Sequence, residues 1–198
     1  MHGAISIGKT RASDLPAAFR VRYTPDMGTS LLVSEHEYLT TSYEPECEFD
    51  NGTLIERNTG ELPHSILMGQ AAALLYQRRK QHRIQVFMIL RIHVGPGRYR
   101  VPDVCVYKQP APREPIPSTP PFIAVEILSP EDRMGRVRKK IDEYLAFGVA
   151  YVWLIDPEER RADVYAASSF YEVKDGMLRT EDPVIEVPLA DLFQALDD

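Results

Sequence analysis

Two carboxylates in this sequence occupy positions where an ionised group is costly. Glu126 interrupts the otherwise apolar run Phe122–Leu128, and a buried ionised carboxylate needs a cation, a partner or hydrogen bonds. Asp103 follows a proline and precedes an alternating apolar run. On two different strands, the two side chains offer oxygens that could meet at one hard cation. Mg²⁺ typically uses one or two protein carboxylates, with water and phosphate oxygens completing its octahedron.

Each carboxylate also has a simpler explanation. Glu126 lies two residues before the end of its run, so its side chain could reach solvent or pair with a nearby arginine. Asp103 taken alone is unremarkable and gains meaning beside Glu126. The metal hypothesis therefore depends on the two residues meeting in space.

A lysine on the following helix is the third candidate. The apolar residues of 134–148 form a stripe centred near Val137 and Ile141, and Lys140 lies on its flank, about 90° from the centre. From there a lysine can extend along the core edge and place its ammonium near the end of the sheet. Lys139 points away from the stripe and is expected to be a solvated charge. Solvation is also the alternative for Lys140.

The start of this helix offers a place for negative charge. Ser129, Pro130 and the acids after them form a pattern typical of a helix start. The free N–H groups would then begin three residues after Glu126 and would favour a phosphate there.

The elements around these residues indicate one α/β domain with a mixed sheet. Phe122–Leu128, the helix and Tyr151–Ile155 form a strand–helix–strand crossover, which implies two parallel strands. Gly95-Pro96-Gly97 joins predicted strands at 84–94 and 99–107. We expect a domain over residues 32–198 and an N-terminal extension over residues 1–31. The remaining expected elements are a helix from Ser34, a hairpin at 47–56 turning at Asn51-Gly52, a helix at 63–82, a proline-rich loop at 108–121, strands at 162–165, 171–174 and 184–187, and a helix at 189–196.

Composition limits the functional class only loosely. The net charge of −6 argues weakly against a protein coated in DNA-binding surface, but it permits a local basic strip. The two cysteines and five histidines lack zinc-ligand spacing, so we expect reduced thiols and no structural zinc. We also expect a cytoplasmic protein without a membrane span, because the sequence contains no long apolar run and no secretory signal.

Short segments in a fixed order carry a resemblance to a known family. Four segments carry it in order: Val101–Val104, Val125–Pro130, Lys140 with Tyr144 before Gly148, and Val152–Pro157. Together with Glu48–Gly52, they resemble the Uma-type restriction endonuclease family over roughly residues 34–196. That family is placed in the PD-(D/E)XK nuclease superfamily, whose restriction-endonuclease-like core is a mixed sheet flanked by helices.

The resemblance implies Mg²⁺-dependent hydrolysis of DNA phosphodiester bonds, with Mn²⁺ as the expected substitute. Asp103 matches the motif aspartate and Glu126 the second acid. The usual lysine position is Leu128, and Lys140 on the next helix matches the lysine that replaces it. Glu48 matches an early acid that adds a metal ligand, directly or through water.

The resemblance also suggests partners. Arg133 and Arg136 are candidate phosphate contacts, as is the basic cluster 78–80, although solvated helix faces also explain these charges. A homodimer would suit an enzyme that cuts both strands. Two alternatives stay open: a degenerate nucleic-acid-binding or assembly protein, favoured by the acidic charge and by Leu128, and a purely structural pairing of Glu126 with Arg133 or Lys140.

Overall fold

A six-stranded mixed sheet forms the centre of the molecule. The computed structural model describes residues 20–22, 32–58 and 60–197. The strand order is β12-β11-β10-β9-β8-β5. The six strands are β5 (Ile84–Met88), β8 (Val104–Lys108), β9 (Ile123–Ile127), β10 (Tyr151–Asp156), β11 (Arg161–Ala166) and β12 (Ser169–Glu172).

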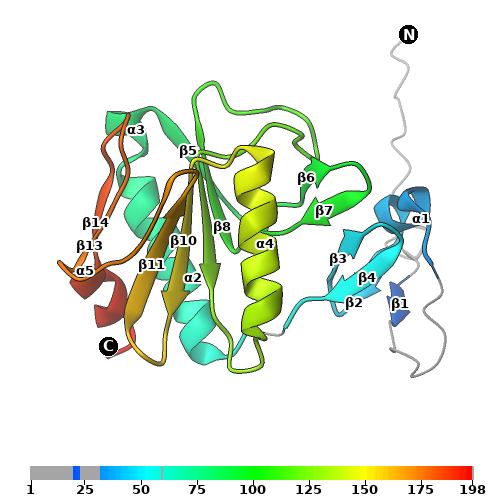
Figure 1. Ribbon diagram of the computed structural model, residues 1–198, viewed down its shortest axis with the longest axis horizontal. Helices are drawn as coiled ribbons and strands as arrows, with labels where there is room; N and C mark the ends of the chain where they lie inside the picture. The colour runs from blue at the N-terminus through cyan, green and yellow to red at the C-terminus, as the bar shows by residue number, and fades with distance from the viewer. Residues whose placement is uncertain (1–19, 23–31, 59, 198) are drawn as a thin grey trace, which may run out of the picture.

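The predicted crossover is present. Strands β9 and β10 are parallel, and the other neighbours in this sheet are antiparallel. Helix α4 (Met134–Phe147) connects β9 to β10 and covers one face, while α2 (Leu62–Gln77) covers the other (Figure 1). Residues of β9 therefore alternate between two buried faces, because successive strand side chains point in opposite directions. Ala124 packs on the α4 face, and Ile123 and Val125 pack on the α2 face.

A second sheet stands beside the first, with the order β4-β3-β7-β6. Asn51 and Gly52 turn the predicted hairpin with φ angles of 47° and 93°, the left-handed conformation that a two-residue turn of this kind requires. An aromatic cluster that includes Tyr38 and Phe49 fills one side of the sheet. The strands are β3 (Cys47–Asp50), β4 (Thr53–Glu56), β6 (Ile92–Gly95) and β7 (Arg98–Arg100).

Smaller elements complete the description. Ser34 caps α1 by accepting a hydrogen bond from the Glu37 backbone N–H, as predicted. The arm predicted for residues 1–31 lies outside the described residues except for β1, which pairs with β2. The remaining elements are β1 (Arg20–Arg22), α1 (Glu35–Thr40), β2 (Ser42–Glu44), α3 (Arg79–His82), β13 (Met177–Arg179), β14 (Glu186–Pro188) and α5 (Leu189–Gln194).

Three predicted long elements are interrupted in the structure. The strands predicted at 84–94 and 99–107 are each broken, and their halves belong to different sheets. Ile89 turns the chain at a φ of 50°, and Pro102 has no N–H for a continuous ladder. The helix predicted at 63–82 is interrupted at Arg78, whose N–H bonds to the Leu75 carbonyl in a tighter turn.

The expected helix start at Ser129 is also wrong. The Asp132 carboxylate accepts a hydrogen bond from the Ser129 N–H at 2.7 Å, and the Asp132 N–H donates to the Ser129 carbonyl. This local pairing holds a turn in place of a helical entry. Helix α4 begins at Met134, so its free N–H groups lie farther along the chain from Glu126 than the phosphate argument assumed.

Candidate active site

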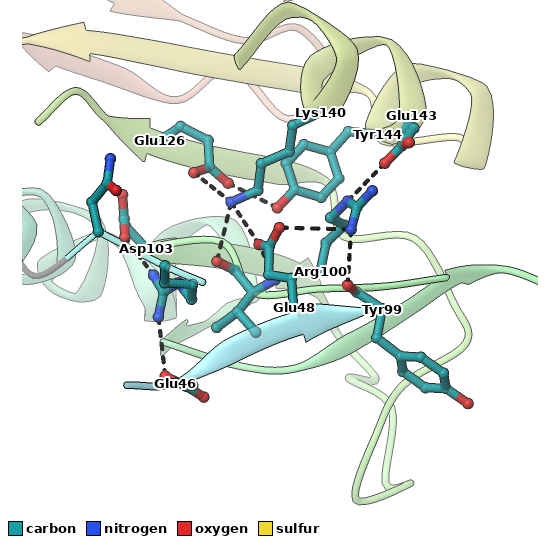
Figure 2. Close-up of polar contacts among 12 residues, drawn as sticks. Glu46, Glu48, Tyr99, Arg100, Asp103, Glu126, Lys140, Glu143 and Tyr144 are labelled. Atoms are coloured by element: carbon teal, nitrogen blue, oxygen red, sulfur yellow. Dashed lines mark hydrogen bonds and ion pairs between the residues drawn. The ribbon is translucent and has the colours of Figure 1, made fainter. Parts of the chain in front are cut away.

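Lys140 lies at the centre of a group of buried polar side chains (Figure 2). Its Nζ is 2.9 Å from Glu126 Oε2 and 2.8 Å from Glu48 Oε1. Burial opposes the ammonium charge, but the carboxylates of Glu126, Glu48 and Asp103 raise the pKa of Lys140 above its usual value. The flank position on α4 thus gives a lysine that joins strands of both sheets. Lys139, the next residue along the helix, is 61% exposed and pairs with Asp50.

Glu126 extends from the central strand β9 toward α4. Its Oε1 accepts a hydrogen bond from the Tyr144 hydroxyl at 2.8 Å. Burial raises the pKa of Glu126 to about 7, and the nearby carboxylates of Asp103 and Glu48 act in the same direction, against Lys140. The side chain is 12% exposed. Glu126 is therefore a carboxylate whose charge the protein compensates only in part.

Asp103 lies just before β8, next to Glu126 in the sheet. Val104 pairs with Val125, and one more step in this antiparallel register places Asp103 opposite Glu126. Asp103 Oδ1 is 2.8 Å from Arg57 NH2, and Oδ2 is 3.2 Å from His64 Nε2. Burial opposes ionisation, but the His64 hydrogen bond and the Lys140 charge lower the pKa of Asp103 overall. Asp103 is held as a carboxylate.

Glu48 belongs to the second sheet and reaches the same site. Its Oε1 accepts a hydrogen bond from the Val101 N–H at 2.9 Å, and its Oε2 is 3.7 Å from the buried Arg100. Arg100 in turn bonds to Glu143 of α4 at 2.7 Å. This network attaches the second sheet to the helix that carries Lys140, and buried pairs of this kind are costly to break.

These residues border one cavity of about 460 Å³. Glu48, Asp103, Glu126 and Lys140 all line it. A closed pair in a sealed pocket would favour the purely structural reading. The pair of Glu126 with Lys140 is closed, while both side chains line the cavity.

The arginines and lysine that were predicted to contact phosphates lie in two separate places. Arg133 and Arg136 are exposed at the start of α4 and line the cavity. The cluster 78–80, which is described in full, does not line it. Arg78 bonds to the Leu74 carbonyl, and the Arg79 guanidinium stacks on the Tyr76 ring.

Sequence reasoning missed two residues of the site, Arg57 and His64. The hairpin register could have placed Arg57, because Cys47 pairs with Glu56 and the next pair brings Arg57 beside Glu46. Their side chains are 3.2 Å apart. For His64 we find no signal in the sequence. Its contact with Asp103 depends on how helix α2 packs beside the segment that leads into β8.

Comparison with known proteins now decides the family. Residues 34–192 match the Uma2 family, described as "Putative restriction endonuclease". The chain belongs to the Uma2 family. The match covers every residue that lines the cavity.

A solved structure resembles this Uma2 chain over most of its length. It is the crystal structure of "a putative nuclease belonging to DUF820" from Anabaena variabilis ATCC 29413. The TM-score is 0.71 at 26% sequence identity, and the similarity covers 81% of this chain and 97% of that one. The predicted restriction-endonuclease-like fold is thereby confirmed. A search of the curated proteins gave no match.

Proposed function

We propose that this protein is a Mg²⁺-dependent endonuclease that hydrolyses DNA phosphodiester bonds. The observation that carries the proposal is that Glu48, Asp103 and Glu126 line one cavity, with the Lys140 ammonium in contact with two of them. Membership of the Uma2 family supports the reaction class. Within the described residues, no helix is long and apolar enough to cross a membrane; a cytoplasmic location and a homodimer remain part of the proposal.

The three acids supply the type of ligand that a hard divalent cation needs, because Mg²⁺ prefers carboxylate oxygens. Asp103 and Glu126 would hold it, with Glu48 contributing directly or through water. Among the described residues, no three His, Cys, Asp or Glu side chains are close enough together to form a ready ligand set. Each acid instead contacts a cationic side chain. A bound cation would substitute for part of this positive charge and would polarise the phosphate and lower the pKa of a water.

The protein's own residues would then act on the substrate. Lys140 keeps its proton at neutral pH, because the surrounding carboxylates raise its pKa, so it can donate N–H groups to the attacking water or to developing negative charge. Tyr144 orients Glu126 through its hydroxyl. Arg133 and Arg136 would contact backbone phosphates at the mouth of the cavity.

Metal binding gives a direct test. We expect calorimetric titration with MnCl₂ to show binding that is lost in Asp103→Asn, because the amide removes a charged ligand while keeping the shape of the side chain. Asp142→Asn is the matched control on the exposed side of α4 and should bind Mn²⁺ as the natural protein does. DNA binding with neither Mn²⁺ binding nor cleavage would favour the degenerate binding protein.

Salt dependence tests the phosphate contacts. Replacing Arg133 and Arg136 together by alanine should lower DNA affinity and reduce the slope of log K against log salt concentration by about 2, since each contact releases roughly one counterion. The control replaces Arg79 and Lys80, which lie away from the cavity. Fluorescence anisotropy at several salt concentrations measures both slopes, and equal slopes would remove Arg133 and Arg136 from the interface.

A further inference from the structure

A half-buried histidine contacts the carboxylate of Asp103. His64 is the third residue of α2, and its Nε2 is 3.2 Å from Asp103 Oδ2. The side chains are 13% and 4% exposed, respectively. The helix therefore brings a ring N–H donor to a carboxylate that is almost entirely withdrawn from solvent.

The two oxygens of Asp103 have different surroundings. Oδ2 accepts a hydrogen bond from the Ile127 backbone N–H at 2.9 Å in addition to the His64 contact. Oδ1 contacts the Arg57 guanidinium, which also reaches Glu46. The strand N–H and the helix-borne imidazole are held by the fold, whereas the Arg57 guanidinium already has a second acceptor in Glu46 and would keep it without Oδ1. Oδ1 is thus the oxygen that can exchange its partner for a cation.

Packing holds the imidazole in this orientation. His64 Nδ1 is buried and has no hydrogen-bond partner among the described residues. Gly60 lies against it so closely that a Cβ at position 60 would be 2.7 Å from Nδ1. With Nε2 engaged by Asp103 and Nδ1 covered, neither nitrogen can take a proton from a water in the cavity. This arrangement argues against His64 as a general base.

We propose that His64 is a positioning residue that, together with the Ile127 N–H, fixes Asp103 so that Oδ1 faces the cation. The inference rests on the proposed function, because it assumes a divalent cation at Asp103. Carboxylates that bind metals are commonly held by such outer hydrogen bonds, and loss of one typically weakens metal affinity about 10- to 100-fold.

Titration of the full chain with MnCl₂ alone tests this role. We expect His64→Leu to weaken Mn²⁺ binding about 10- to 100-fold, because leucine fills the space without a donor. His64→Gln places an amide N–H near the position of Nε2 and should bind close to the natural affinity. His36→Leu, at an exposed histidine of α1, is the matched control and should leave binding unchanged.

A second variant and a second measurement separate positioning from general damage. His64→Asn carries an amide that ends short of Asp103, so it should weaken Mn²⁺ binding as leucine does. DNA affinity in metal-free buffer should be the same in all folded variants. Natural Mn²⁺ affinity in His64→Leu or His64→Asn would overturn the inference and leave the proposed function intact. Absence of Mn²⁺ binding in the unaltered protein would overturn both.

Discussion

Replacing Glu126 by glutamine is expected to lower the rate of Mg²⁺-dependent DNA cleavage on the order of 10³-fold. The amide keeps the size of the side chain and can still accept the Tyr144 hydrogen bond, but it removes the charge that would hold the cation. The measurement is plasmid cleavage at fixed enzyme and Mg²⁺ concentrations. Glu172→Gln makes the same change on the edge strand β12 of the same sheet and should cut normally.

Equal activity in Glu126→Gln and the unaltered protein would mean that the cleavage comes from a contaminant or from another site. Loss of activity in Glu172→Gln as well would indicate a general effect on the sheet. The assignment therefore needs a difference between the two variants.

The same substitution should stabilise the metal-free protein at alkaline pH. Burial raises the pKa of Glu126 from 4.5 to about 7, so the folded state binds a proton that the unfolded state has already lost between those values. The free energy of unfolding therefore falls as pH rises through this window, by about 3 kcal/mol in total at most. Glutamine has no proton to lose. Urea unfolding in EDTA at pH 5 and pH 8 should show the gain at pH 8 alone.

Replacing Lys140 by methionine is expected to lower both the rate of DNA cleavage and the free energy of unfolding. Methionine fills similar space without the ammonium, which leaves Glu48 and Glu126 without the cation that joins them. Breaking a buried pair by removing one partner costs about 3–5 kcal/mol, and losing a transition-state donor lowers the rate about 10²- to 10³-fold. At pH 8 the loss of stability should be larger than at pH 5, where Glu126 can take up a proton.

Lys139→Met is the matched control, one residue away on the same helix. Lys139 is 61% exposed, and an exposed ion pair contributes at most about 1 kcal/mol. Thermal and urea unfolding compare the stability of the two variants; cleavage is not compared, because Lys139 also lines the cavity. If Lys139→Met and Lys140→Met lose equal stability, Lys140 is not the buried centre of the site.

Several elements were predictable because local chemistry specifies them. The Asn51-Gly52 turn, the Ser34 cap and the buried run of β9 each depend on residues close together in sequence. The start of α4 was predicted wrongly, because the Asp132 side chain competes for the Ser129 backbone. The sequence pattern for a helix start and for such a turn uses the same residue types.

The sequence by itself determined that Glu126 lies within a buried strand. It also determined that Lys140 lies on the flank of the apolar face of the next helix. An apolar run around an acid and a helical period of residues are local properties, readable without a structure. Only the tertiary structure decided which groups meet these residues. The second sheet brings Glu48 to Lys140, the hairpin brings Arg57 to Asp103, and α2 brings His64 to the same carboxylate. Such contacts depend on how sheets and helices pack, because residues distant in sequence become neighbours only when the core between them is buried.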